Sequence, residues 1–318
     1  MEVHYLSIKR LLLIILSVII SINFTSCVNS KKDSNKVKII TTFYPIYIMA
    51  LNITDGIDNV EVLNMSEQNT GCLHDFQLKT EDMKNIETAD AVIINGAGME
   101  TFMDKIFEEF PQKNVIDSSK GIDLIKENYH DDIDSHNTSH DGHNHHHDDV
   151  NPHIWVSISN YIMQVENVSN GLVAIDPDNK DKYKKNTDKY IASLNNLKSE
   201  MHNNLSNVSK KDIITLHESF DYFAKEFNLN IIAVINHEPN TDPSSKEIKE
   251  TIDIVNKFER TIPLFVEPQY PSTSAEVISN ETGAKVYMLD SGVTGENVKD
   301  SYIKAMQKNL LVLKEALI

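Results

Sequence analysis

Cysteine is scarce in this chain of 318 residues, which contains only Cys27 and Cys72. Two cysteines cannot build the disulfide framework of a small secreted domain, and Cys72 has no partner for an internal disulfide if Cys27 is lipidated, as argued below. Because Cys72 lies two residues before His74, its thiolate could act as a metal ligand. We expect instead that it is buried as a small apolar side chain.

Basic residues are also few. The chain has 30 Lys and Arg residues against 47 Asp and Glu residues, and its formal net charge is −17 at pH 7. Binding to nucleic acid requires a basic surface that neutralises phosphates, so this balance excludes nucleic acid as a partner. An acidic chain is compatible with the attraction of cations, although net charge speaks mainly to solubility.

The apolar run near the N-terminus, LLLIILSVII at 11–20, is shorter than the roughly 20 apolar residues of a membrane-spanning helix. It follows two basic residues and precedes FTSC, in which small residues come before Cys27. This order is typical of a lipoprotein signal peptide, so we expect residues 1–27 to be that peptide and Cys27 to carry the lipid. A plain signal peptide or an anchor helix is the alternative. The polar residues 28–36 are expected to form a flexible tether.

Histidine, by contrast, is concentrated in one segment. Residues 130–149, HDDIDSHNTSHDGHNHHHDD, hold seven of the 13 histidines together with six aspartates. Imidazole and carboxylate groups bind borderline divalent cations, zinc above all. We therefore expect an auxiliary metal-gathering loop, with a solvated spacer as the alternative. The histidines of this loop are His130, His136, His140, His143, His145, His146 and His147.

Four further side chains are candidate metal ligands because each follows the end of a chain segment. They are His74 in GCLHDFQ, His153 in NPHIW, His217 in IITLHESFDYF and Asp290 in KVYMLDSG. None is near another in sequence, so only a fold could bring them together. The alternative for each is a single capped or solvated side chain, and Asp148 and Asp149 could compete with His153 as ligands.

Short β-branched runs alternate with helical patterns in both halves of the chain. The predicted strands are 37–43, 59–65, 89–96, 114–119, 212–216, 231–235, 263–267 and 285–289. Strands separated by helices indicate parallel α/β architecture. No convincing sequence repeat relates the two halves.

One predicted helix is long enough to connect two lobes. Apolar residues recur at helical spacing over 177–206, which at 1.5 Å per residue would span roughly 45 Å. Asp176 is a favourable N-cap, and Pro177 suits the first helical position. We predict an N-terminal α/β lobe at 37–175, a linking helix at 176–207 and a C-terminal α/β lobe at 208–318.

The predicted strands place the candidate ligands at one type of position. In open parallel sheets, ligands bind beyond the carboxyl ends of the strands. His217 and Asp290 directly follow predicted strands of the second lobe, whereas His74 and His153 follow strands or loops of the first lobe. Two ligands from each lobe would place a metal in a cleft between the lobes.

The order of these motifs resembles a known family, the metal-binding lipoproteins of zinc and manganese ABC importers. The resemblance covers about residues 37–318 and rests on GCLHDFQLKTEDMKNIETADAVIINGAGME, NPHIWVSISN, HESFDYFAKEFNL and FVEPQYPSTSAEVISNETGAKVYMLD. It implies two α/β lobes joined by one rigid long helix. It also implies that the metal ligands are His74, His153, His217 and Asp290.

Within this family, a His-rich loop before the second ligand implies zinc, with manganese as the alternative. The family often has Asp where this chain has Asn151. The resemblance implies an extracytoplasmic, lipid-anchored, monomeric receptor that captures Zn²⁺ and delivers it to an ABC permease. A separate ATPase subunit would hydrolyse ATP, so the receptor itself is not expected to be an enzyme.

Three other functions need weighing. GAGMET at 96–101 matches part of a dinucleotide fingerprint, but Thr101 stands where the third glycine belongs, so we expect a tight turn. A zinc hydrolase is a second alternative, with Glu218 or Glu267 as general base. Four protein ligands would leave no position for activated water, which favours capture over hydrolysis. A metal-binding adhesin or structural zinc protein is the third alternative.

Overall fold

The computed structural model describes residues 36–66, 73, 76–126, 150–235 and 243–318. Val37–Ile318 form one compact unit. The predicted signal peptide, lipidated cysteine and His-rich loop lie outside the described residues, as do Cys72 and His74. No helix among the described residues is long and apolar enough to cross a membrane.

The first sheet is built from four parallel strands in the order β2-β1-β3-β4. Its central strand β1 is rich in isoleucine, and Ile39 pairs with Val62 on one side and Ala91 on the other. Strands covered on both faces favour such continuous apolar runs. The strands are β1 (Val37–Thr41), β2 (Val60–Asn64), β3 (Ala91–Ile94) and β4 (Asn114–Asp117). The shorter helices of this lobe are α2 (Tyr44–Ile53), α3 (Thr80–Thr88), η1 (Thr101–Met103) and α4 (Asp104–Glu109).

The second sheet repeats this topology with four parallel strands in the order β6-β5-β7-β8. The strands are β5 (Asp212–Thr215), β6 (Asn230–Val234), β7 (Leu264–Val266) and β8 (Val286–Met288). The shorter helices are η4 (Glu218–Phe220), α7 (Asp221–Phe227), α8 (Ser245–Val255) and α9 (Thr273–Thr282). The prediction of two parallel α/β lobes is confirmed, and the two lobes share a strand order that the sequence does not reveal as a repeat.

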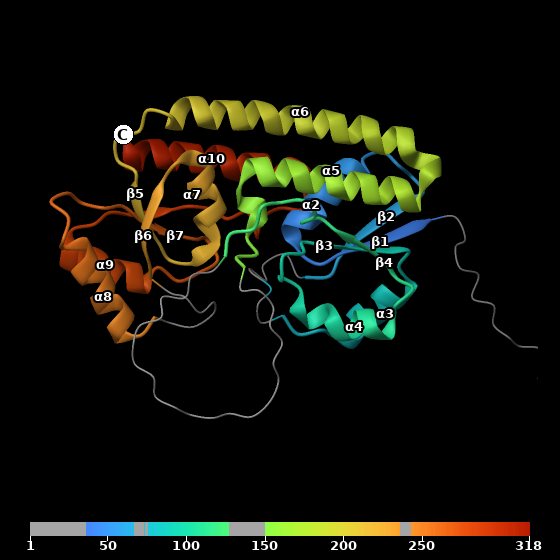
Figure 1. Cartoon of the computed structure of the whole chain (residues 1–318), viewed down its shortest axis with the longest axis horizontal. Helices are drawn as coiled ribbons and strands as arrows, with labels where there is room; N and C mark the ends of the chain where they lie inside the picture. Colours follow the sequence, from blue (N-terminus) through green and yellow to red (C-terminus); the bar gives the residue numbers. More distant parts are fainter. Residues whose placement is uncertain (1–35, 67–72, 74–75, 127–149, 236–242) are drawn as a thin grey trace, which may run out of the picture. The chain divides into compact units, whose positions relative to one another are not determined.

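The longest of three long helices runs from the side of the first sheet to the side of the second, and the other two lie beneath it, one toward each sheet (Figure 1). The three helices are α5 (Ile158–Ile175), which follows the turn η2 (Ile154–Val156), α6 (Lys180–Leu205) and α10 (Ser301–Leu317). In Figure 1, α6 runs alongside α5 and α10 from the side of the first sheet to the side of the second. Its 26 residues span about 39 Å, so the predicted connecting helix is present.

The start of the connecting helix differs from the prediction. Pro177–Asn179 form the 3-10 turn η3 before α6 begins, and no side chain caps α6. The Asp176 carboxylate instead accepts hydrogen bonds from the Asn179 side chain and the Tyr183 hydroxyl, both at 2.8 Å. It therefore fastens the turn between α5 and α6 through side chains.

Aromatic side chains fill the junction where α5 and α10 meet. The rings of Tyr161 and Tyr302 stack with centroids 3.6 Å apart and planes within 2°. Both rings are buried, and the hydroxyl of Tyr161 lies 3.1 Å from that of Tyr190 on α6. Offset or stacked aromatic pairs contribute beyond their buried area, so this junction links the three long helices tightly.

Candidate metal centre

Two of the predicted metal ligands, His153 and His217, lie side by side. His153 immediately precedes the turn η2, and His217 lies two residues beyond the end of β5. Their ring centroids are 5.0 Å apart with planes at 86°, and both residues are buried. The fold thus brings together imidazoles from the first and second lobes, and of the two only His217 lies at the carboxyl end of a strand.

Asp290 lies two residues beyond β8 and is held by its own loop and by α10. One carboxylate oxygen accepts a hydrogen bond from Gly292 N at 2.8 Å, and Asn309 binds both the backbone N–H and the carbonyl of Asp290. Burial raises the pKa of the Asp290 carboxyl above its usual range. These bonds fix the position of the loop that carries this predicted ligand.

The complete four-residue site remains a prediction because His74 lies outside the described residues. Within the described part of the chain, no group of three or more His, Cys, Asp or Glu side chains could hold a metal ion. The structure therefore brings His153 and His217 together without gathering a third described ligand beside them.

Asn151 orients His153. Its side-chain oxygen accepts a hydrogen bond from His153 N at 2.9 Å and lies 2.8 Å from His153 Nδ1. The Asn151 amide nitrogen donates to Glu218 O and to the Asp221 carboxylate, which are both acceptors. The oxygen of Asn151 must therefore face the imidazole, so Nδ1 carries the proton and donates. Nε2 is left with the lone pair that a metal needs.

Aromatic rings border the histidine pair on both sides. The Trp155 ring centroid lies 5.2 Å from that of His153, and the Tyr270 centroid lies 5.8 Å from that of His217. Trp155 also donates from Nε1 to Ser291 O at 2.8 Å, across the two lobes. A dry, aromatic wall of this kind strengthens electrostatic interactions with any bound cation.

The two candidate general bases of the hydrolase alternative are placed differently. The Glu267 carboxylate is 1% exposed and accepts hydrogen bonds from Ser219, Ser291 and Gln269. Glu218 lies beside His217 in η4, and its carbonyl accepts from Asn151. A carboxylate with three donors around it is engaged in holding loops, which weakens the case for Glu267 as a base.

The segment 291–300, which follows Asp290, crosses from the second lobe to the first and is fastened there. It is held by hydrogen bonds from Trp155 Nε1 to Ser291 O (2.8 Å), from Tyr44 Oη to Glu296 O (2.6 Å) and from Asn52 Nδ2 to Lys299 O (2.8 Å), and by the ion pair of Lys299 with Asp55 (2.6 Å). Three of these partners lie on or just after α2. The segment that follows Asp290, a predicted ligand of the second lobe, is thus tied to the first lobe.

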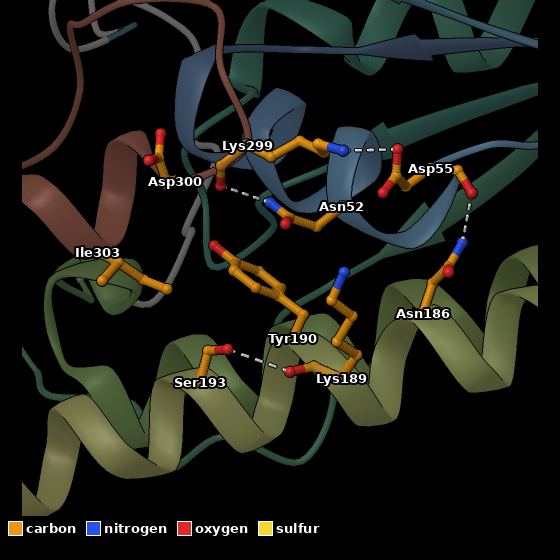
Figure 2. Close-up of a pocket in the computed structure, with 9 residues that line it drawn as sticks. All are labelled: Asn52, Asp55, Asn186, Lys189, Tyr190, Ser193, Lys299, Asp300 and Ile303. Carbon is orange, nitrogen blue, oxygen red and sulfur yellow. Dashed lines mark hydrogen bonds and ion pairs between the residues drawn. The ribbon is translucent and has the colours of Figure 1, made fainter.

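A pocket of about 180 Å³ opens beside Lys299, where the 291–300 segment is bound to Asn52 and Asp55 (Figure 2). It is lined by Asn52, Asp55, Asn186, Lys189, Tyr190, Ser193, Lys299, Asp300 and Ile303. None of these residues is a predicted metal ligand, and the ammonium group of Lys299 pairs there with the Asp55 carboxylate at 2.6 Å. The pocket therefore lies outside the candidate metal centre.

The GAGMET turn is closed by a buried carboxylate. Glu100 accepts hydrogen bonds from Asn95 N, Gly96 N and the Thr42 hydroxyl at 2.7, 3.0 and 2.7 Å. Burial raises the pKa of Glu100 to about 7. The protein's own carboxylate therefore binds the backbone N–H groups at the start of this turn. A buried acidic side chain beside the glycines supports the turn and disfavours a bound phosphate, which speaks against the dinucleotide alternative.

Comparison with known proteins gives consistent matches over nearly the whole described chain. Residues 39–316 match the family described as zinc-uptake complex component A, periplasmic. The high-affinity zinc uptake system protein ZnuA of Bacillus subtilis is 31% identical over 296 residues, which cover 91% of this chain and 90% of that protein. The zinc-binding lipoprotein AdcA of Streptococcus pneumoniae is 28% identical over 307 residues. The match covers 95% of this chain but only 60% of AdcA, so the chain spans little more than half of that relative.

Solved structures give the same fold. The Mn²⁺ complex of FpvC from Pseudomonas aeruginosa has a TM-score of 0.74 at 28% identity and covers 89% of this chain and 98% of that one. Zn(II)-bound AdcA from Streptococcus pneumoniae has a TM-score of 0.72 at 26% identity and covers 89% of this chain and 58% of that one.

Proposed function

The chain belongs to the zinc-uptake complex component A family, and we propose that it is the receptor that captures Zn²⁺ for an ABC importer. The observation that carries the proposal is the buried pair His153 and His217, which the fold brings together from two lobes. In this proposal the metal is cargo, held by His74, His153, His217 and Asp290 and then released to a permease.

The choice of zinc follows from the proposed ligands. Three imidazoles and one carboxylate suit Zn²⁺, whereas Mn²⁺ favours carboxylate, carbonyl and water oxygens. Relatives named for zinc support this choice, while FpvC was crystallised with Mn²⁺ and with Ni²⁺. Manganese is therefore the second candidate cargo.

Binding without catalysis is the expected chemistry. Four protein ligands complete a tetrahedron and leave no coordination position for an activated water. The named relatives are uptake and binding proteins. One structural neighbour is a laminin-binding adhesin, but its 24% identity concerns the fold alone.

The cellular setting completes the proposal. We place the receptor outside the cytoplasm as a monomer, with the signal peptide cleaved before Cys27, Cys27 lipidated as the mature N-terminus and residues 28–36 as tether. The lobes are assigned to 37–175 and 208–318, joined by the helix at 176–207. A membrane permease and its ATPase subunit are the proposed partners, in keeping with a family described as part of an uptake complex.

Native mass spectrometry tests the proposal directly. Protein purified from minimal medium should carry one tightly bound Zn²⁺, and His217→Ala protein prepared in parallel should carry none. Bound Mn²⁺ in place of Zn²⁺ would move the assignment to the manganese candidate. Hydrolysis of esters, peptides or phosphoesters above the rate of free zinc, lost in Glu218→Gln, would overturn capture in favour of catalysis.

A further inference from the structure

Glu267 joins the two ligand loops of the second lobe. It directly follows β7, and its two carboxylate oxygens receive hydrogen bonds from Ser219 (2.8 Å), Gln269 (2.7 Å) and Ser291. Ser219 lies two residues after His217, and Ser291 is adjacent to Asp290. One carboxylate therefore holds both segments that carry predicted second-lobe ligands.

The same network extends to the first lobe. Ser291 donates its hydroxyl proton to Glu267, and its carbonyl accepts from Trp155 Nε1 at 2.8 Å. Trp155 lies two residues after His153 and packs beside that ring. A chain of two hydrogen bonds thus runs from Glu267 to the neighbourhood of the first-lobe imidazole.

The environment of Glu267 is costly for a carboxylate. The residue is 1% exposed, and its three partners are neutral donors. Burial raises its pKa to about 7, while the hydrogen bonds lower it. An apolar side chain would avoid this cost, so the carboxylate is best explained by the two loops that it binds at once.

We propose that Glu267 is a positioning residue of the metal site, whose carboxylate fixes the separation of the loops carrying His217 and Asp290. The inference rests on the proposed function. Residues that do not bind the metal themselves but hold its ligands in place orient those ligands. Their loss weakens the affinity for the metal by roughly 10- to 100-fold.

Glu267→Gln is the decisive variant because it keeps the size of the side chain. Its amide oxygen can accept from one serine, but its NH₂ group cannot accept from the other, so one loop is released. We expect Zn²⁺ affinity, measured by competition with a chelator, to fall roughly 10- to 100-fold. With Co²⁺ as a spectroscopic substitute, the visible bands should shift, because the ligand geometry relaxes.

Glu226→Gln is the matched control. Glu226 also accepts from two serine hydroxyls, those of Ser157 and Ser159, both at 2.6 Å, but these partners lie at the start of α5. This variant should lose stability while keeping the Zn²⁺ affinity and the Co²⁺ spectrum. If Glu267→Gln does not fold, Ser219→Ala and Ser291→Ala carry the test, and each should weaken Zn²⁺ binding by releasing one loop.

The outcomes separate the inference from the proposed function. Wild-type affinity and an unchanged Co²⁺ spectrum in folded Glu267→Gln, or in both serine variants, would overturn the positioning role while the receptor assignment stands. A wild-type protein that binds neither Zn²⁺ nor Co²⁺ would overturn both. Reduced affinity with an altered spectrum in Glu267→Gln, and neither change in Glu226→Gln, would establish the role.

Discussion

The imidazole rings of His153 and His217 lie edge to face, with centroids 5.0 Å apart. The two residues belong to different lobes, since His153 precedes α5 and His217 follows β5. Their contact is therefore a product of tertiary structure alone. It places two buried imidazoles, both predicted metal ligands, at the meeting point of the lobes.

Replacing either of these histidines should abolish tight Zn²⁺ binding. Structural zinc sites contribute roughly 10–16 kcal/mol over four ligands, so one ligand is worth roughly 2.5–4 kcal/mol, a loss on the order of 100- to 1,000-fold. Titration against a chelator should show this loss in His153→Ala and His217→Ala. His202→Ala is the control, because that imidazole lies on α6 beside Glu226. Wild-type affinity for Zn²⁺ in His217→Ala would show that His217 is not a ligand.

We expect that neither alanine nor aspartate can replace the amide side chain of Asn151 without loss. Asn151→Ala removes the acceptor for His153 Nδ1 and should weaken Zn²⁺ binding roughly 10- to 100-fold. Asn151→Asp keeps the acceptor but sets a second carboxylate about where the amide now meets Asp221 at 3.0 Å. Two carboxylates so close cannot both ionise freely, so stability at pH 7 should fall by roughly 1–3 kcal/mol. Denaturant titration should show recovery in the double variant Asn151→Asp, Asp221→Asn. Without that recovery, repulsion is not the cause.

Gly96 and Gly98 should differ in their tolerance of alanine. Both have positive φ, +77° and +83°, but a Cβ at Gly96 would lie 2.1 Å from the Asp117 carboxylate, while Gly98 has open space. We expect Gly98→Ala to cost roughly 1–2 kcal/mol from backbone strain. Gly96→Ala should cost roughly 1–3 kcal/mol more, because the side chain is also overpacked. Urea unfolding measures both, and equal losses would contradict the close approach.

Glu100 should make the metal-free protein less stable as pH rises. Its folded pKa is raised to about 7 from an ordinary 4.5, so the folded state keeps a proton that the unfolded state releases. The free energy of unfolding should therefore fall between about pH 4.5 and 7, by up to a few kcal/mol, and the deficit should persist above pH 7. Glu100→Gln should lose this component when unfolding is measured from pH 5 to 8. Identical pH profiles for the two proteins would exclude it.

Deletion of 130–147, which lie outside the described residues, should separate weak zinc sites from the tight one. The histidines of this segment should bind additional Zn²⁺ that is lost on mild acidification, since unperturbed histidine titrates near pH 6.5. Isothermal titration of the deletion protein should show fewer sites with the tight affinity nearly intact. Unchanged stoichiometry would mean that the loop binds nothing, and total loss would mean that the tight site is misplaced.

The sequence was sufficient to predict the strands because each lies in a short apolar run with β-branched or aromatic residues. Each of the eight predicted runs overlaps a strand, from Val37–Thr41 to Val286–Met288, and the connecting helix follows from its apolar period. The common strand order of the two sheets was not visible in the sequence. The strand order depends on which strands pair with each other. Because the two sheets pack against different helices, their side chains need not be alike, and no sequence repeat has to result.

Individual ligands could be proposed from their position after strands, but their supporting residues could not. Asn151 was noticed only as a departure from the family, and Glu267 only as a possible base. Asn151 is hydrogen-bonded to Asp221, and Glu267 is hydrogen-bonded to Ser219 and Ser291. All of these partners lie far away in the sequence. Neither spacing nor composition encodes such contacts.

The 291–300 segment has a mechanical consequence. It begins at the residue after Asp290 and is fastened to Tyr44, Asn52 and Asp55 of the opposite lobe. A movement of the first lobe away from the second should therefore act on Asp290 through this short segment. Displacement of α2 and displacement of the Asp290 carboxylate, a predicted metal ligand, should therefore be coupled.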